Sequence, residues 1–196
     1  WFQTTAINAY LQPLLASYVE QLAKGLTNSV GSATLGINQS SGGLMSAERT
    51  AAFPVRTALS GPAAGAVGAA HIARDAERPF VITLDMGGTS ADVALITDGD
   101  TEITFQRDVA GFPIRLAMVD IDTVGAGGGS IAWFERDGLL KVGPISAGAV
   151  PGPACYGQGG TEPTVTDANL VLGRLSEAGL LDGTLPLNRE SAISAV

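Results

Sequence analysis

Apolar residues recur along the first part of the chain at the three- and four-residue spacing of one helix face. The pattern predicts a helix over residues 2–26, kinked by Pro13, which cannot donate a backbone hydrogen bond. Further along, residues 80–84 and 93–96 form two apolar runs of strand length on either side of a glycine turn. We therefore expect a packing helix and, later, a central buried strand that pairs with the strand after the turn.

Weaker patterns predict the other elements. A stretch of alanines and glycines follows Ser60 and Pro62, residues suited to a helix start. Because glycine in a helix costs about 1 kcal/mol relative to alanine, this stretch indicates close approach of another backbone. The remaining expected elements are strands at 33–39, 102–109 and 114–121, a hairpin of 131–134 with 139–142, and helices at 46–53, at 167–174 after Thr166, and from Glu190.

The turn between the two apolar runs carries candidate chemistry. Gly87 and Gly88 can adopt positive φ and, lacking Cβ, let backbone N–H groups approach an anion. Asp85 and Asp92 are hard oxygen ligands suited to Mg²⁺ and its waters, and Thr89 adds a hydroxyl. These residues together are what a magnesium–nucleotide site needs. The alternative is an ordinary tight turn.

Composition and charge narrow the choice of partners. The 196 residues have a net charge of −8, which argues against a nucleic-acid-binding surface. The same charge repels an anionic nucleotide, so local N–H groups and a metal ion would be needed to bind one. A single cysteine, Cys155, fits a reducing cytoplasm, and no apolar stretch is long enough to span a membrane. The chain begins at Trp1 and stops inside an expected helix, so we expect a fragment of a longer polypeptide.

The glycine turn, preceded by the small-residue helix, resembles the second phosphate-binding hairpin of the actin-like ATPases. Five runs in collinear order resemble the hydantoinase A/oxoprolinase family more specifically, and the match covers essentially the whole chain. They lie at residues 59–69, at 85–92, at 119–133, at 151–157, which reads Pro-Gly-Pro-Ala-Cys-Tyr-Gly, and at 160–174. The resemblance implies an α/β fold: one lobe of an actin-like ATPase (ribonuclease H-like), with a mixed sheet and flanking helices. Residues 1–60 would lead in from the preceding lobe, and 61–196 would form the second nucleotide-binding lobe.

The resemblance also implies a function. Family members of the N-methylhydantoinase and 5-oxoprolinase type hydrolyse cyclic amides with ATP and Mg²⁺, by phosphoryl transfer to the substrate oxygen. Asp85 and Asp92 would then be catalytic and hold Mg²⁺ through water. Nucleotide-binding residues would be Gly87, Gly88, Thr89, Gly127, Gly128 and Gly129. Expected partners are a small cyclic amide and a hydantoinase B-type subunit, in an oligomeric cytoplasmic enzyme with no nucleic acid or membrane partner.

Two departures from the family pattern leave alternatives open. The family's earlier phosphate loop is absent, so half of the ATP cleft is missing and the fragment alone should be inactive. Asp122 stands where family members commonly have histidine; Asp120, Asp122 and Cys155 are candidate ligands of a second divalent metal, Zn²⁺ or Mn²⁺. The alternative for Cys155 is a small buried residue. Rival functions are a subunit of an ATP-dependent acetone or acetophenone carboxylase, and a non-catalytic structural lobe.

Overall fold

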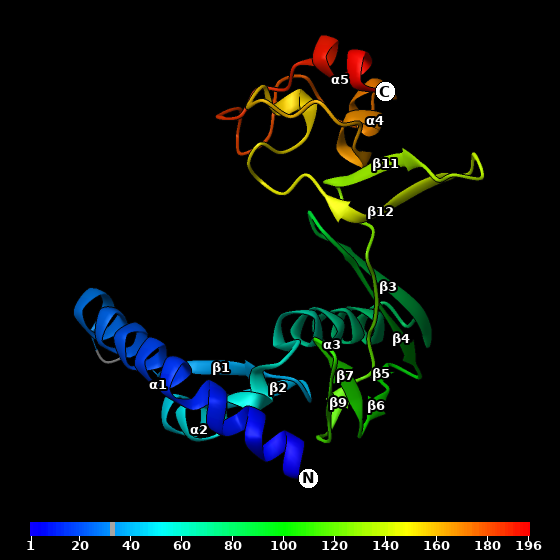
Figure 1. Ribbon diagram of the computed structural model, residues 1–196. Coiled ribbons are helices and arrows are strands. Elements are labelled where there is room, and N and C mark those ends of the chain that lie inside the picture. Colours follow the sequence, from blue (N-terminus) through cyan, green and yellow to red (C-terminus); the bar gives the residue numbers. More distant parts are fainter. Residues whose placement is uncertain (32–33) are drawn as a thin grey trace. The chain divides into compact units, whose positions relative to one another are not determined.

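The computed structural model describes residues 1–31 and 34–196, and it shows the α/β fold that the sequence predicts (Figure 1). Contacts divide the chain into two compact units. Unit 1 consists of residues 1–83 and 94–121, and unit 2 of residues 84–93 and 122–196. The boundary expected at residue 60 concerns the lobes of a longer protein and stays a prediction.

Most of the helices belong to unit 1. Its elements are α1 (Phe2–Val30), β1 (Gly36–Gln39), β2 (Gly43–Ser46), α2 (Ala47–Ala52), η1 (Pro54–Thr57), α3 (Ser60–Asp75), β5 (Asp100–Thr101), β6 (Ile103–Thr104), β7 (Arg107–Val109), β8 (Phe112–Ile114) and β9 (Met118–Val119). Strands β3 (Phe80–Met86) and β4 (Ala91–Thr97) start and end in this unit, respectively, while the turn between them belongs to unit 2. The start of the strand expected at 33–39 lies outside the described residues.

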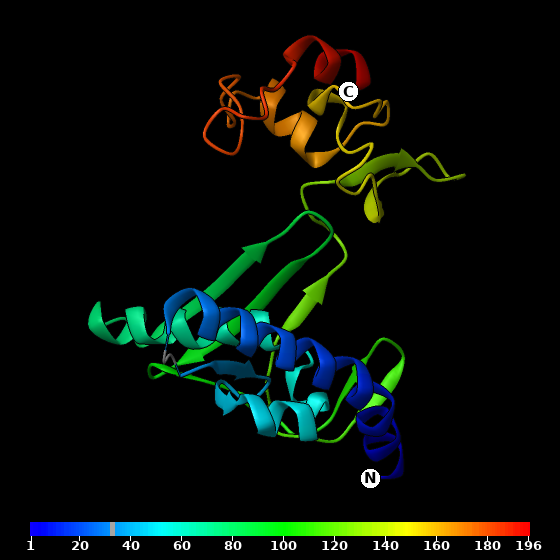
Figure 2. The ribbon, with the colours of Figure 1, turned by 90° about the vertical axis from the view of Figure 1, so that its left-hand side faces the viewer.

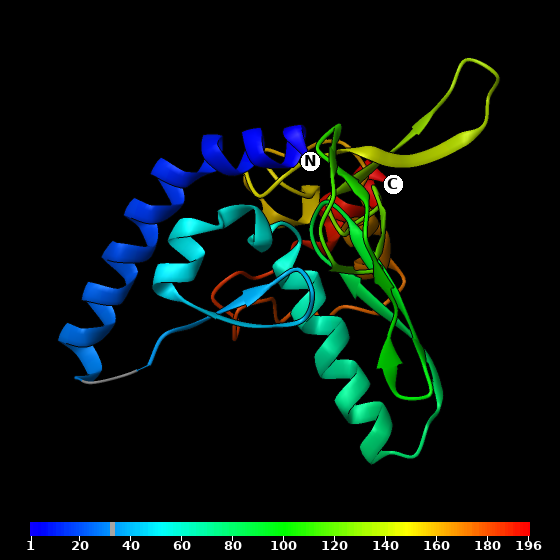
Figure 3. The same cartoon turned by 90° about the horizontal axis from the view of Figure 1, so that it is seen from below.

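Helix α1 is longer than predicted, contains Pro13 and bends along its length (Figure 3). It lies beside α2 (Figure 2), and the Asn8 side chain links it to the end of α2 and to η1. The Asn8 side chain donates to the carbonyl of Ala52 at 3.1 Å and accepts from the N–H of Val55 at 3.3 Å. The expected apolar stripe is only partly buried, since Leu14 is 70 % exposed.

Helix α3 packs its alanines against strand β4. Ala63 and Ala66 contact Ala94, and Ala70 and Ala73 contact Ile96, which is fully buried. Small side chains on this face therefore permit the close packing expected from the sequence. The glycines Gly61 and Gly68 do not take part, because a Cβ at either position would meet nothing within 4 Å.

Strand β3 pairs with β4, and β10 (Asp122–Val124) lies on the other side of β4 (Figure 2). The pairing of the two apolar runs is thus confirmed. The expected burial is wrong: among the described residues β3 is an edge strand, and Phe80 and Ile82 are 70 % and 72 % exposed. One face of β3 packs through Val81 on α3, whereas no described residue covers the face of Phe80 and Ile82.

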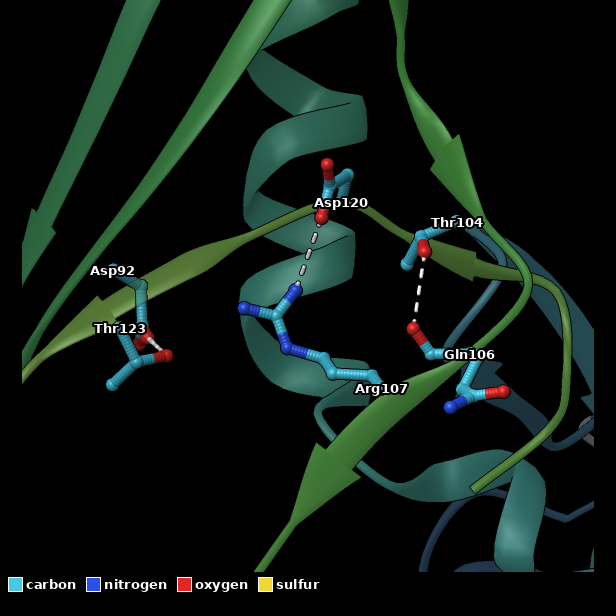
Figure 4. A network of polar contacts seen from close by, with 6 residues as sticks. All are labelled: Asp92, Thr104, Gln106, Arg107, Asp120 and Thr123. Atoms are coloured by element: carbon cyan, nitrogen blue, oxygen red, sulfur yellow. Dashed lines mark hydrogen bonds and ion pairs between the residues drawn. The ribbon is translucent and has the colours of Figure 1, made fainter. Parts of the chain in front are cut away.

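The two strands expected after this hairpin are broken into shorter ones. Strand β6 pairs with β9, and β7 pairs with β8 across Ala110 and Gly111, both of which have positive φ. Arg107 points toward Asp120, and its Nη1 lies 3.3 Å from the carboxylate (Figure 4). Each expected strand is therefore divided: β6 and β9 pair with each other, whereas β7 and β8 form a separate hairpin.

Unit 2 contains a hairpin, a long loop and two short helices. Its further elements are β11 (Ser130–Phe134), β12 (Leu140–Ser146), η2 (Ala154–Tyr156), α4 (Val165–Val171) and α5 (Arg189–Ala195). The antiparallel β11–β12 hairpin confirms the prediction. The core of the unit is formed by Cys155, Leu170, Leu187 and Ala192. None of the helices in the described part of the chain is long and apolar enough to cross a membrane.

Candidate nucleotide site

The turn between β3 and β4 is closed by one backbone hydrogen bond, from the N–H of Gly87 to the carbonyl of Ser90 at 2.9 Å. Within residues 1–31 and 34–196, the N–H groups of Gly88 and Thr89 donate to no protein acceptor. A Cβ at Gly88 would meet nothing within 4 Å, so this residue faces open space. The turn therefore has two adjacent backbone donors available for an anion.

Of the two properties that favour glycine at this turn, the structure uses one. Neither Gly87 nor Gly88 has a φ in the left-handed region. What matters at Gly88 is the missing side chain, which leaves its backbone accessible. Positive φ values occur at the far end of β4, where Asp98 and Gly99 form the turn into β5.

A second glycine loop, residues 127–129, holds the β3–β4 turn in place. The N–H of Gly128 donates to the carbonyl of Gly87 at 2.9 Å, and the N–H of Gly129 donates to the carbonyl of Gly88 at 2.7 Å. These bonds hold the turn by its carbonyls, so its N–H groups can be presented to a ligand. Because their own N–H groups are already donated, Gly128 and Gly129 act as supports here.

Gly127 lies directly behind the turn. A Cβ at this position would come within 2.7 Å of the carbonyl oxygen of Gly87 and of the backbone nitrogen of Ser90. Its N–H donates to the Ser130 hydroxyl at 2.8 Å, and Ser130 is fully buried. Of the six glycine-loop residues predicted to bind nucleotide, the structure thus leaves backbone donors free at Gly88 and Thr89, while Gly127 permits the close approach of the two loops.

The two loops open on a cavity of about 390 Å³, within the usual size of small-molecule sites. The lining comes from both glycine loops, the proline-rich loop and the start of α4. The lining residues are Gly87, Gly88, Thr89, Gly128, Gly129, Gly148, Ala149, Pro153, Tyr156 and Thr166. Four of these residues belong to the proline- and glycine-rich loop at 143–160, and loops of this length within compact domains are usually functional.

The two carboxylates flank the turn in different surroundings. Asp85 is exposed near the end of β3. Asp92 on β4 is half-buried, and its carboxylate accepts a hydrogen bond from the Thr123 hydroxyl of β10 at 2.6 Å (Figure 4). Exposed or partly exposed carboxylates can hold Mg²⁺ through its waters, so this donor set fits the ion.

The second metal site receives no support. Among the described residues no three histidine, cysteine or acidic side chains are grouped as metal ligands would be, and this includes Asp120, Asp122 and Cys155. Asp120 pairs with Arg107, and Cys155 is fully buried in the core of unit 2. Burial foremost, and then the neighbouring Asp167, raises the pKa of the Cys155 thiol to about 12. The alternative, a small buried residue, therefore describes Cys155 better.

A buried carboxylate, Asp167, fixes the backbone between Pro153 and Tyr156, two residues that line the cavity. The sequence analysis did not identify this role. Asp167 has no exposed surface and accepts hydrogen bonds from the N–H groups of Ala154 and Cys155 at 3.2 and 2.8 Å. It also accepts from the N–H and hydroxyl of Thr164 at 3.0 and 2.7 Å. Thr164, and not Thr166 as predicted, caps α4, which begins two residues earlier than expected. The three-residue spacing of Thr164 and Asp167 is the capping-box signal that would have identified both.

Replacing Asp167 with alanine is expected to lower the free energy of unfolding by about 3–5 kcal/mol, because several buried donors lose their acceptor at about 1–3 kcal/mol each. Asp137→Ala is the matched control: Asp137 also accepts a backbone N–H, from Leu139 at 3.0 Å, but it is exposed. Its loss should cost less than about 1 kcal/mol. Urea unfolding followed by circular dichroism measures both, and equal losses would contradict the role given to Asp167.

Comparisons with known proteins give a single family. The sequence profile of the family described as hydantoinase/oxoprolinase matches residues 2–196. The caprolactamase subunit alpha of Pseudomonas jessenii is 43 % identical over 98 % of this chain and 28 % of its own length. The 5-oxoprolinase of Dictyostelium discoideum is 38 % identical over 88 % of this chain and 14 % of its own length. The chain thus spans less than a third of these relatives.

Solved structures agree with the sequence comparison. The crystal structure of the ATP-dependent caprolactamase from Pseudomonas jessenii matches with a TM-score of 0.78 and 42 % identity, over 98 % of this chain and 28 % of that one. A nucleotide-free acetone carboxylase matches with a TM-score of 0.78 and 31 % identity, over 90 % of this chain and 25 % of that one. These likenesses agree with the predicted fold, a lobe of the actin-like ATPase type.

Proposed function

Because the chain belongs to the hydantoinase/oxoprolinase family, we propose that it carries a phosphate-binding site of an ATP-dependent enzyme that acts on cyclic amides. The observation that carries this proposal is the pair of free N–H groups at Gly88 and Thr89, open to a cavity of about 390 Å³ and flanked by Asp85 and Asp92. The ATP dependence of the caprolactamase named above supports the nucleotide, and the substrates of the named relatives support the amide.

The reaction would proceed by phosphoryl transfer. The amide oxygen of the substrate attacks the γ-phosphorus of ATP, so that a new O–P bond forms, the bond to the β-phosphate oxygen breaks, and ADP leaves. A first water then adds to the activated carbon, the ring C–N bond breaks as the nitrogen takes up a proton, and a second water hydrolyses the resulting acyl phosphate to a carboxylate and free phosphate. Such a transfer requires positioning and charge stabilisation more than covalent catalysis, which matches donors fixed on a backbone turn.

Each residue of the turn has a role in this proposal. The N–H groups of Gly88 and Thr89 bind the phosphoryl oxygens, while residues 127–129 keep the turn in place. Asp85 and Asp92 hold Mg²⁺ through its waters, and the ion would neutralise phosphate charge. This local arrangement is required because the net charge of −8 repels an anionic nucleotide at longer range.

We also propose that the chain works within a longer polypeptide. It spans 28 % of the caprolactamase subunit and 14 % of the 5-oxoprolinase named above. The exposed apolar face of β3, with Phe80 and Ile82 at its start, would be covered by the remaining polypeptide. The subunit name of the caprolactamase relative supports a partner subunit, which we propose to be of the hydantoinase B type. We further propose that the complete enzyme is oligomeric and cytoplasmic.

A ketone carboxylase is the second candidate, favoured by the likeness to acetone carboxylase. Its substrate would be a ketone that loses an α-proton, and the resulting enolate oxygen would attack the γ-phosphorus as ADP leaves. Bicarbonate would then take the phosphoryl group from the enol phosphate, the carboxyphosphate would release phosphate and carbon dioxide, and the enolate carbon would add to that carbon dioxide. The phosphate turn would serve both reactions equally. Dependence of ATP hydrolysis on a ketone and bicarbonate would favour the carboxylase, and dependence on a cyclic amide alone would favour the hydrolase.

The experiment uses the complete polypeptide that contains this chain, purified with its partner subunit. With Mg²⁺ present, we expect ATP hydrolysis to rise in response to 5-oxoproline, N-methylhydantoin or caprolactam. The 196-residue chain alone should show little or no turnover, because the other phosphate loop lies elsewhere. Robust ATP hydrolysis by this chain alone would contradict a cleft built from two lobes.

A further inference from the structure

The cavity beside the phosphate turn has a second kind of lining that phosphate binding does not use. Glycine backbone and Thr89 supply polar contacts, whereas the exposed Ala149 and the partly buried Tyr156 supply apolar surface and one phenol hydroxyl. Phosphoryl oxygens need N–H donors or cations and gain nothing from an alanine and an aromatic ring. An uncharged ring with a single polar group matches such a surface, because binding sites commonly combine apolar walls with a few placed polar groups.

This wall is held rigidly. The N–H of Tyr156 donates to the carbonyl of Pro153 at 3.0 Å, and Pro153 itself is fully buried. The two residues between them, Ala154 and Cys155, donate their N–H groups to Asp167. The backbone that carries the Tyr156 ring is therefore held both by the bond to Pro153 and by the bonds to Asp167. A precise binding contact requires such support.

Tyr156 lies beside Thr166, which is linked to the phosphate turn. Burial raises the pKa of Tyr156, with Cys155 and Asp167 acting in the same direction and the Thr166 side chain acting against them. The phenol is thus neutral and keeps its proton at physiological pH. Thr166 donates both its N–H and its hydroxyl to the carbonyl of Gly128, each at 2.8 Å. Since Gly128 donates to Gly87, hydrogen bonds join the turn to Thr166, which lines the cavity together with Tyr156.

We propose that Ala149 and the ring of Tyr156, held in place by the buried Pro153, form the binding surface for the ring of the cyclic amide, and that the Tyr156 hydroxyl hydrogen-bonds the bound amide. The inference rests on the proposed function and adds to it the place of the second substrate. It puts the amide in the same cavity as the phosphate turn, as direct transfer between the two substrates requires. Tyr156 is a substrate-binding residue in this account, and the nucleotide is bound independently of it.

The test compares Tyr156→Phe with the parent in the complete polypeptide and its partner subunit, using ATP with 5-oxoproline, N-methylhydantoin and caprolactam. Loss of one hydrogen bond should raise KM for the amide about fivefold to tenfold, while KM for ATP changes less than about twofold. Tyr10→Phe, on α1 and 84 % exposed, is the matched control and should change neither value. Thermal melts should show equal stability, which separates binding from a structural defect.

The outcomes distinguish this inference from the proposed function. If Tyr156→Phe weakens a non-hydrolysable ATP analogue and leaves KM for the amide unchanged, the wall binds the nucleoside and only this inference fails. Unchanged values for both ligands would likewise overturn the inference alone. If the parent enzyme hydrolyses no ATP in response to any of the three amides, the proposed function fails and the inference falls with it.

Discussion

Replacing Asp85 with asparagine is expected to lower kcat of the ATP-dependent reaction about 100- to 1000-fold. The substitution keeps the shape of the side chain and removes the charge that would hold Mg²⁺ and its waters beside the phosphate turn. Because Asp85 is exposed near the end of β3, its loss should leave the fold intact. Steady-state kinetics with varied ATP, together with a thermal melt, measure both effects in the complete polypeptide.

Asp75→Asn is a suitable control for this measurement. Asp75 is also an exposed carboxylate, but it lies at the end of α3 and pairs with His71 at 3.7 Å, on the same helix. Its replacement removes the same charge from unit 1 without touching the turn, so kcat should stay within about twofold, as surface substitutions usually have small effects. An equal loss in both variants would show that overall charge, and not an ion at Asp85, limits the rate.

The second large effect is expected at the glycines of the site, where two substitutions should both weaken ATP binding but differ in their effect on stability. Gly127→Ala places a Cβ within 2.7 Å of the turn's backbone, so the two loops must separate. We expect a loss of about 1–3 kcal/mol in the free energy of unfolding, together with weakened ATP binding. Gly88→Val points into open space and should leave stability nearly unchanged, while the branched side chain raises the Kd for ATP at least about tenfold by blocking the free N–H groups.

Unfolding curves and titration with a non-hydrolysable ATP analogue separate these two effects. Gly68→Ala on α3 is the control, because a Cβ there also meets nothing within 4 Å and no ligand is proposed nearby. It should raise stability slightly, by up to about 1 kcal/mol, as alanine is the better helix former. If Gly127→Ala binds the analogue as tightly as the parent, the support given by residues 127–129 is unnecessary and their assigned role is wrong.

Local patterns predicted the elements around the turn well. The two apolar runs, the glycines between them and the carboxylates at each end are contiguous in sequence, so the paired strands β3 and β4 followed directly from them. The exposure of β3 could not be predicted. A run such as residues 80–84 is apolar on both faces, and whether each face is covered depends on segments distant in the chain.

The roles of single residues depended on contacts that sequence does not display. Three consecutive glycines at 127–129 suggested a ligand loop, yet two of their N–H groups are donated to a turn about forty residues earlier. The start of α4 was ambiguous because Thr164 and Thr166 can both cap a helix. Thr164 is the cap because Asp167 completes a capping box with it: the Asp167 N–H donates to the Thr164 hydroxyl, and the Asp167 carboxylate accepts from the Thr164 N–H. The same carboxylate accepts from the N–H of Cys155.

The most direct test is a structure of the complete polypeptide with Mg²⁺ and a non-hydrolysable ATP analogue. The account predicts that oxygens of the terminal phosphates accept hydrogen bonds from the N–H groups of Gly88 and Thr89, with the ion's waters between the phosphates and Asp85. A nucleotide bound elsewhere, with these two N–H groups facing solvent, would contradict it. In that case the glycine turn is a structural element, and the lobe has no part in phosphoryl transfer.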